Sequence, residues 1–227
     1  MTANRPVGFA VADPTPAPRP SPITLLGRTV TLAPLQASHA EELFPHIGGT
    51  EHGSLWDYKF GGPPVTVDEL RTFIAGFEQP ENANKTKLMG YIGLLNIVPV
   101  HRSIEVGPVM YRYSSALQRT TPATETLFLL ARYAFRDLGY RRLEWKCNNL
   151  NEASKNAARR YGFEFEGVFR QHKIIKGRNR DTAWFSLLDS EWVEGGVEAG
   201  FGRWLDEGNF DEQGRQKRRL EDFVRRK

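Results

Sequence analysis

The sequence has few features of a secreted, membrane-bound or metal-stabilised protein. Its only cysteine is Cys147, which excludes a disulfide framework and a zinc site built from several cysteines. No apolar run approaches the roughly 20 residues that a helix needs to span a bilayer. The first residues also lack the apolar core of a signal peptide. We therefore expect a soluble cytoplasmic protein with no metal and no membrane partner.

The excess of positive over negative charge comes from one end of the chain. The formal net charge is +4, but residues 215–227 hold seven basic and two acidic side chains, so this tail carries +5 and the rest of the chain −1. A surface for nucleic acid would have to lie on the tail. The tail is short, and Leu220, Phe223 and Val224 make it partly amphipathic and able to pack on the domain. We therefore do not expect a nucleic-acid partner.

Composition divides the chain into three parts. Residues 1–22 hold six of the 14 prolines and almost no hydrophobic periodicity, which predicts a disordered leader. Residues 25–192 alternate between strand-like and helix-like patterns, and we expect one domain there. Residues 193–227 are first Gly-rich and then basic, and we expect them to form a helical C-terminal extension.

The middle part predicts an α/β fold, with a mixed (α+β) sheet that has helices on its faces. Alternating or continuous apolar character indicates strands at 28–35, 88–98, 102–113 and 142–147, and a closing hairpin turns at 176–179. Helical spacing indicates helices that begin near Ser38 and Thr66, a long helix over 123–138 ended by Gly139, and another over 151–161. The strand–helix–strand step through 123–138 suggests a parallel crossover.

Two features interrupt this pattern in ways that suit a ligand. Gly107-Pro108 lies inside a strand, and because proline cannot donate a ladder hydrogen bond we expect a bulge or a splayed edge there. The segment "QRTTPA" (118–123) precedes the long helix, where Thr121 can act as the cap and Pro122 suits the first turn. Such a helix start can hold a pyrophosphate, although an ordinary capped helix fits the same residues.

The order of these segments resembles the GNAT N-acetyltransferase superfamily over roughly residues 25–192. "QRTTPA" is similar to the family's Q/R-x-x-G-x-G/A signature, and "NEASKNAARRYGF" (151–163) is similar to its N-x-x-A/S…G-F segment. "IEVG" (104–107) resembles a stretch common in the ribosomal-protein N-terminal acetyltransferase branch. The resemblance implies acetyl-CoA as co-substrate, with its pyrophosphate on the turn and its pantetheine along a splayed central sheet. The cofactor-binding residues it implies are Val109, Met110, Tyr111, Gln118, Arg119, Thr120, Thr121, Pro122, Ala123, Thr124 and Asn151.

Three departures from the family pattern keep another interpretation open. Thr121 stands where the family usually has glycine, and Ala158 stands where many members have a general-acid tyrosine. The polar loop 79–87 is too short for the strand that the family usually has there, so the sheet could lack one strand. A non-catalytic acyl-CoA-binding protein is therefore an alternative to an enzyme.

Acetyl transfer to an amine needs a neutral amine, a stabilised thioester oxygen and a reprotonated thiolate. Glu105 is an acid in an apolar strand next to the Gly107-Pro108 break, and we predict that it is the general base. A structural pairing with Arg102 is the alternative for this residue. By resemblance to the N-x-x-S members, Ser154 is a candidate to hydrogen-bond the departing thiol. His101 and His172 are other candidates for the base.

The acceptor side is predicted less sharply. Trp56 and Tyr58 alternate in "GSLWDYKFGG" (53–62), and they either line an acceptor pocket or plug the core. Cys147 shares its strand face with Leu143 and Trp145, which indicates a core residue rather than a nucleophile. We expect a small-molecule amine as acceptor, with a peptide or protein N-terminus as the alternative.

Overall fold

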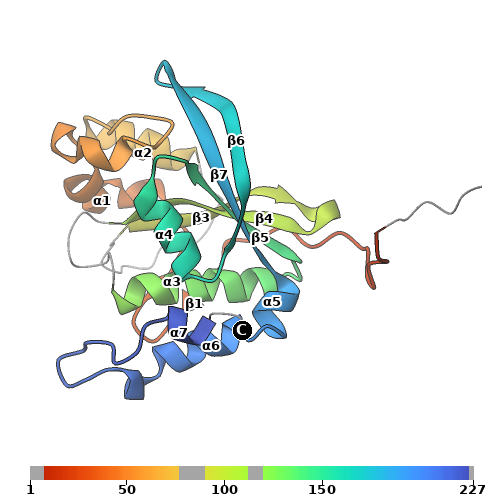
Figure 1. The fold of residues 1–227 in the computed structure, drawn as a ribbon. Helices are drawn as coiled ribbons and strands as arrows, with labels where there is room; N and C mark the ends of the chain where they lie inside the picture. The colour runs from red at the N-terminus through yellow and green to blue at the C-terminus, as the bar shows by residue number, and fades with distance from the viewer. Residues whose placement is uncertain (1–7, 77–89, 112–119, 225–227) are drawn as a thin grey trace, which may run out of the picture.

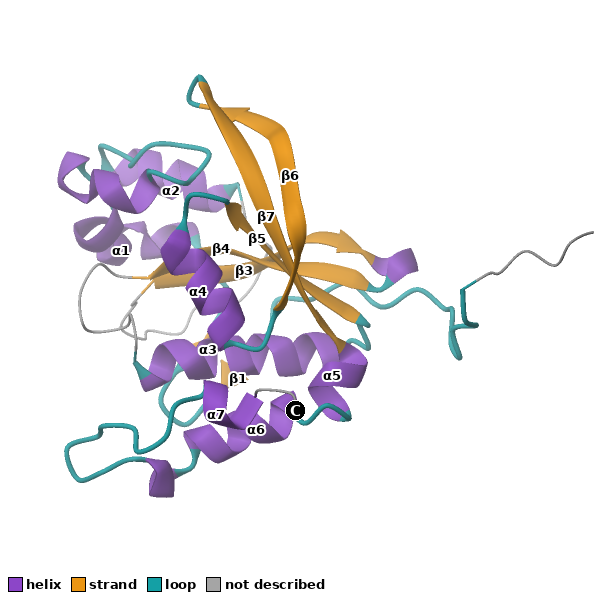
Figure 2. Cartoon of the chain, viewed as in Figure 1, coloured by secondary structure: helices purple, strands orange, loops and turns teal. Residues whose placement is uncertain are grey.

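The computed structural model describes residues 8–76, 90–111 and 120–224. Within these ranges the main sheet has five strands, in the order β3 (Gly90–Val98), β4 (Ser103–Tyr111), β5 (Arg142–Asn148), β7 (Arg178–Leu188) and β6 (Glu164–Ile175). β4 and β5 run parallel, and the other neighbours run antiparallel. The sheet is therefore mixed, as the sequence predicts. Figure 2 shows that β6 and β7 continue past the other strands as a long hairpin.

The crossover between the parallel strands is α3 (Thr121–Arg132), as the sequence predicts. A π-helical turn over Tyr133–Asp137 continues this helix. The chain then leaves it through Gly139, whose φ of +68° lies in the left-handed region that glycine adopts at low cost. The apolar stripe of α3 lies against the sheet, so the start of the helix is held at a defined place beside β4 and β5.

Helices cover both faces of the sheet (Figure 1). On one face, α3, α5 (Asp189–Val193) and α6 (Val197–Leu205) enclose the larger hydrophobic core, which includes Ile104 and Val106 of β4. On the other, α1 (Ala40–Ile47) and α2 (Val67–Ala75) enclose a smaller core that includes Met110. α4 (Glu152–Arg160) contacts both β5 and β6. One strand, β4, therefore contributes to both cores.

The sheet is irregular at the Gly107-Pro108 break. On the β3 side, Val106 and Val109 face Leu94 and Ile92, so three steps along β4 oppose two along β3, which is a bulge. On the β5 side, paired residues end at Glu105 opposite Glu144, although both strands continue. The bulge and the splayed edge that the sequence predicts are both present, and they leave a gap between β4 and β5.

The first predicted strand, 28–35, is not part of the main sheet. β1 (Leu25–Leu26) and β2 (Thr31–Leu32) form a separate hairpin. The backbone N–H groups of Arg28 and Thr29 in its turn donate to the buried carboxylate of Glu125 on α3, at 2.7 and 2.6 Å. A side-chain contact from another element thus overrides the local strand pattern. The strand that the sheet could lack falls on loop 79–87, which lies outside the described residues.

Residues 13–21 differ from the disordered leader expected from their composition. Ala17 is 6% exposed, and its N–H donates to the carbonyl of Pro99 at 3.1 Å. Asp13 pairs with Arg102 at 2.6 Å. Proline restricts the unfolded backbone, so a proline-rich segment loses less entropy when it docks in an extended form. Residues 1–7 of the predicted leader lie outside the described ranges.

The C-terminal extension packs on the domain in its described part. After α6, the chain passes through a loop to the short α7 (Glu221–Val224). Leu220 and Val224 are 0% and 5% exposed within the larger core. Trp204 donates from Nε1 to Oε1 of Gln216 at 3.0 Å. The apolar side of this extension is therefore structural, whereas its basic side chains from Arg215 to Arg219 are exposed.

Candidate active site

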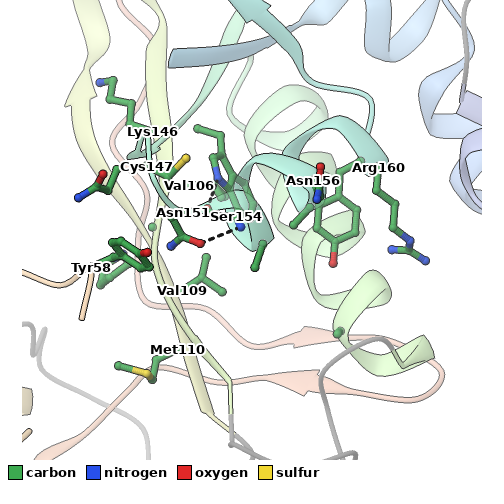
Figure 3. Close-up of a pocket in the computed structure, with 18 of the residues that line it drawn as sticks. Tyr58, Val106, Val109, Met110, Lys146, Cys147, Asn151, Ser154, Asn156 and Arg160 are labelled. Atoms are coloured by element: carbon green, nitrogen blue, oxygen red, sulfur yellow. Dashed lines mark hydrogen bonds between the residues drawn. The ribbon is translucent and has the colours of Figure 1, made fainter. Parts of the chain in front are cut away.

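A cavity of about 1560 Å³ occupies the gap between the diverging strands β4 and β5. Its wall includes the start of α3, one side of α4, the loop after the 3-10 turn η2 (Thr50–Trp56), and the β6–β7 hairpin. Figure 3 shows Asn151 and Ser154 between two cations of this wall, Lys146 and Arg160. The cavity wall therefore combines a helix start, two diverging strands and a hairpin, and these parts differ in their chemistry.

The α3 end of the cavity is built from a helix N-terminus. Thr120, Thr121, Pro122 and Ala123 line it. The cap residue is Thr120, in extended conformation, rather than Thr121 as the sequence suggests, so Thr121 and Pro122 form the first turn. Thr124 is not among the residues that line the cavity. It is 1% exposed and accepts a hydrogen bond from the lining residue Arg160 at 3.0 Å. Gln118 and Arg119 of the predicted turn lie outside the described residues.

The bulged strand β4 supplies the next part of the wall. Val109 and Met110 line the cavity as predicted, and Tyr111 ends the strand in register with Gly90. The Nζ group of Lys59 donates to the carbonyl of Val109 at 2.6 Å. At Val109, where β4 no longer pairs with β5, a side chain therefore donates to the backbone oxygen in place of a neighbouring strand. A ligand could replace this side chain as the hydrogen-bond partner of the open edge.

The start of α4 lies beside this edge. Asn151 is the cap of the helix and accepts from the backbone N–H of Ser154 at 3.0 Å (Figure 3). The hydroxyl oxygen of Ser154 accepts from Nε1 of Trp145 at 3.0 Å. Because that contact orients the oxygen, the hydroxyl proton of Ser154 can be donated to a neighbouring acceptor, of which the Cys147 sulfur is one. Both predicted residues of this segment therefore belong to the cavity.

Cys147 lies next to Ser154 and behaves as a core residue. It is 6% exposed and belongs to the larger core. Burial raises the pKa of its thiol, and a hydrogen bond with Ser154 opposes that shift only in part. A thiol with a raised pKa is a poor nucleophile, as the sequence pattern indicates.

Ala158 stands where the family pattern has a general-acid tyrosine, and Tyr161 follows it three residues later. Ala158 is fully buried in the core. Tyr161 lines the cavity near Arg160, and burial raises the pKa of its phenol despite the nearby guanidinium. A protonated phenol therefore lies in the cavity wall at the α3 end. The helix ends at Arg160, so Tyr161 no longer follows the helical spacing, and sequence reasoning missed its place.

Glu105 is 7% exposed and lines the cavity at the point where β4 leaves β5. Its Oε2 accepts from Nδ2 of Asn96 at 2.6 Å and from Nζ of Lys146 at 2.9 Å. Lys146 also pairs with Glu144 at 2.7 Å. The suggested alternative, a pair with Arg102, does not form, because Arg102 pairs with Asp13. All of the hydrogen bonds described for the Glu105 carboxylate use one of its two oxygens.

The hairpin end of the cavity is lined by cations that sequence reasoning missed. Lys59, Lys173 and Arg180 line it together with Phe60. Burial, and then the charge of Arg180, lower the pKa of Lys59 to about 8. These residues come from a loop and from two strands, and a local sequence pattern gives no signal that they meet. Of the predicted bases, His172 lies in this wall and bonds Thr182 at 3.0 Å, whereas His101 is an exposed residue of the turn after β3.

The two predicted acceptor-side aromatics have different positions. Tyr58 lines the cavity, and its hydroxyl donates to the carbonyl of Leu150 at 3.3 Å. Trp56 is 2% exposed, belongs to the smaller core and donates to the carbonyl of Ile47 at 2.8 Å. The structure thus brings Tyr58 to the site and places Trp56 beneath the loop that carries Tyr58.

Metal and membrane features are not found in the described part of the chain. No group of three or more histidine, cysteine, aspartate or glutamate side chains there could hold a metal ion. None of the described helices combines the length and the apolar character needed to cross a bilayer.

Comparison with known proteins gives the class of this protein. The family model of the acetyltransferase (GNAT) domain matches residues 29–164, which is more than half of the chain. The chain therefore belongs to the GNAT acetyltransferase family, and it is an acetyltransferase.

Particular relatives agree with this assignment. A crystal structure of a GCN5-related N-acetyltransferase from Brucella melitensis has a TM-score of 0.82 and 38% identity, and the match covers 92% of this chain and 97% of that one. YoaA of Bacillus subtilis, an uncharacterized N-acetyltransferase, is 28% identical over 54% of this chain and 71% of its own. YdaF of the same species, whose name assigns it provisionally to the ribosomal N-acetyltransferases, is 31% identical over 46% of this chain and 56% of its own.

Proposed function

We propose that this acetyltransferase moves an acetyl group from acetyl-CoA to a primary amine by direct attack in a ternary complex. The observation that carries the proposal is the continuous cavity that joins the N-terminus of α3 to the carboxylate of Glu105. A helix N-terminus offers backbone N–H groups and a positive dipole end to a pyrophosphate. The open edge of β4 at Val109 and Met110 would hold the pantetheine arm beside it.

The reaction uses residues between these two ends. The amine nitrogen attacks the thioester carbonyl carbon, the carbon–sulfur bond breaks, and a proton of the attacking nitrogen passes to Glu105. Ser154, oriented by Trp145, donates a hydrogen bond to the departing sulfur. The proton on Glu105 then passes through water to the thiolate, which gives the free thiol and restores the carboxylate. In this proposal Glu105 is the catalytic base and Ser154 stabilises the leaving group.

The acceptor is proposed to be a small-molecule amine, with a peptide N-terminus as the second candidate. The aromatic ring of Tyr58 and the lining of the hairpin end would enclose a small acceptor. The name of the relative YdaF favours a peptide N-terminus. Both classes present a primary amine to the same carboxylate, so one assay compares them.

The experiment is an acetyl-transfer assay that follows free thiol release from acetyl-CoA with a panel of amino acids, polyamines and short peptides. Glu105→Gln keeps the shape of the side chain and removes the base. Turnover should fall roughly 10²–10⁴-fold, with partial recovery at high pH where free amine accumulates. Coenzyme A should still raise the melting temperature of this variant.

Glu144→Gln is the matched control. Glu144 pairs with the same Lys146 but does not line the cavity, so its loss should leave turnover within about threefold. Unchanged turnover in a folded Glu105→Gln variant would rule out Glu105 as the base. Coenzyme A binding without thiol release for any acceptor would instead favour the non-catalytic acyl-CoA-binding alternative.

A further inference from the structure

Arg180 is a buried cation with unused hydrogen-bonding capacity. It is 8% exposed and lines the cavity from β7, just beyond the last β7 residue that pairs with β5. Its Nε atom is buried and has no hydrogen-bond partner. Among the residues that the structure describes, no carboxylate lies within ion-pairing distance of its guanidinium. Buried guanidinium groups are normally paired, because removing a charge from water is costly.

The surroundings of Arg180 add positive charge instead of compensating it. Phe60 lies beneath two cations, with Cζ of Arg180 at 5.1 Å and Nζ of Lys173 at 4.8 Å from its ring centroid. Lys59, the neighbour of Phe60 in sequence, is close enough to Arg180 for the guanidinium to lower the lysine pKa. We call Lys59, Lys173 and Arg180 the cation group. Within the described chain, none of the three forms an ion pair.

The carboxylate that attracts Arg180, that of Glu105, is already engaged. Glu105 acts on Arg180 only through the longer-range Coulomb attraction. Its carboxylate is hydrogen-bonded by Asn96 and Lys146, at 2.6 and 2.9 Å. The contact with Phe60 does not satisfy an N–H group, and that ring is 64% exposed. Lys59 donates to the carbonyl of Val109 at 2.6 Å, but no described carboxylate forms an ion pair with Lys59, Lys173 or Arg180, so the charge of the cation group is not compensated within the described chain.

The location of the group fits the acceptor rather than acetyl-CoA. The helix N-terminus proposed for the pyrophosphate lies at the α3 end, with Arg160 beside it. Arg180 lines the hairpin end of the same cavity together with Phe60 and Lys173, and Glu105 lines that cavity too. An anion held here would lie next to the attacking amine.

We propose that the cation group recognises a carboxylate on the acceptor, so that the acceptor is an amine that also carries a carboxylate near its nitrogen. The planar guanidinium of Arg180 matches a carboxylate in a bidentate contact, and Lys59 adds a second donor. The ligand also supplies the counter-ion that the buried guanidinium lacks. This inference rests on the proposed function and specifies its acceptor class.

The test compares acceptors that differ only in one carboxylate. The free amino-acid arm consists of alanine against alaninamide, glutamate against glutamine and aspartate against asparagine, the last two pairs as α-carboxamides, so that no neutral member keeps a carboxylate. Tetrapeptides with Asp against Asn at position one or two form the peptide arm. The acidic member of at least one arm should have a kcat/KM at least about tenfold higher, as expected for one charge-assisted hydrogen bond. The arm that shows this preference identifies the source of the carboxylate.

Arg180→Gln should remove this preference. Its kcat/KM should fall at least about tenfold more for the acidic acceptor than for the neutral one, mainly through KM, so that the two values become similar. Arg180→Lys keeps the positive charge but cannot make the bidentate contact, and it should recover part of the lost kcat/KM for the acidic acceptor. Arg178→Gln is the matched control, because Arg178 is an exposed residue of the same strand outside the cavity.

A readout without turnover separates the two proposals. The preferred acidic acceptor should raise the melting temperature of the wild type, and this shift should be absent in Arg180→Gln. Equal kcat/KM for acidic and neutral acceptors, or an unchanged preference in Arg180→Gln, overturns the carboxylate site and leaves the acetyltransferase function intact. If no acceptor is acetylated, the proposed function fails, and absence of the acid-dependent melting shift then overturns the site as well.

Discussion

At the residue scale, the buried ammonium group of Lys59 lowers the folding stability of the protein. The pKa of its ammonium is about 8 instead of 10.5, because of burial first and of Arg180 second. Between these values the unfolded chain binds a proton that the folded chain releases, so stability rises with pH across this window. Below about pH 8 the folded state carries the penalty in full.

Replacing Lys59 by methionine should therefore stabilise the protein at neutral pH. The free energy of unfolding should rise by about 1–3 kcal/mol at pH 7, the loss of the hydrogen bond to Val109 being included. The gain should diminish above pH 8 and disappear near the ordinary lysine pKa. Urea denaturation of the variant and the wild type at several pH values measures the difference. A gain in the free energy of unfolding that is independent of pH, or a loss at pH 7, would show that the charge of Lys59 does not destabilise the folded state.

At the element scale, the start of α3 decides whether the helix can hold a pyrophosphate. Ala123 is 3% exposed and lines the cavity in the first turn, so a larger side chain there would block approach to the backbone N–H groups. Coenzyme A should raise the melting temperature of the wild type, and this shift should be lost in Ala123→Leu. Differential scanning fluorimetry at several coenzyme A concentrations makes the measurement.

Thr121→Gly is the opposite change in the same turn. It removes a β-branched side chain from the cavity wall, and it should keep or enlarge the shift caused by coenzyme A, even though glycine lowers the stability of the unliganded helix. If Ala123→Leu retains the full shift while folded, coenzyme A does not bind at this helix start.

At the scale of the whole molecule, the C-terminal extension closes the larger core. Leu220 and Val224 are buried there, and a side chain at Gly200 would collide with the backbone of Phe223, at 2.6 Å from its carbonyl oxygen. Leu220→Ala should lower the free energy of unfolding by about 2–5 kcal/mol. Truncation after Gly214 should destabilise the chain further. Arg219→Gln, a change of an exposed neighbour, should be nearly neutral in the same denaturation experiment.

A truncated chain with the melting temperature of the wild type would show that the extension is dispensable. The expected loss also has a consequence for nucleic-acid experiments on the basic tail. Because the tail contributes to the core, a loss of nucleic-acid binding after its deletion could come from unfolding or from the loss of positive charge, and the experiment would not separate them. Substitution of the exposed basic residues one by one is the cleaner test.

Much of the sheet and its helices could be predicted from the sequence, because those signals are local. The apolar period of 3.6 over 123–138 indicates α3, and the alternation of Leu143, Trp145 and Cys147 indicates a strand with one buried face. Gly107-Pro108 indicates the bulge and the splay, since a missing N–H group breaks a ladder wherever it occurs. Asn151 indicates the cap of α4 for the same kind of local reason. These local features indicate the elements that line the cavity, and the resemblance to the family implies that the sheet opens between β4 and β5.

The partners of the charged and aromatic side chains depended on tertiary structure. Glu105 pairs with Lys146 instead of Arg102, and Phe60 contacts Lys173 and Arg180. Glu125 binds the turn at Arg28 and Thr29, where the sequence pattern indicates a strand. Each of these contacts joins residues far apart in the chain, and a charge carries no periodicity that names its partner. Burial on a sheet or helix follows from the alternation of apolar residues, but the pairing of charges follows only from which surfaces the fold brings together. The strands and helix starts that frame the site could therefore be predicted from the sequence, whereas the charged residues at its hairpin end could not.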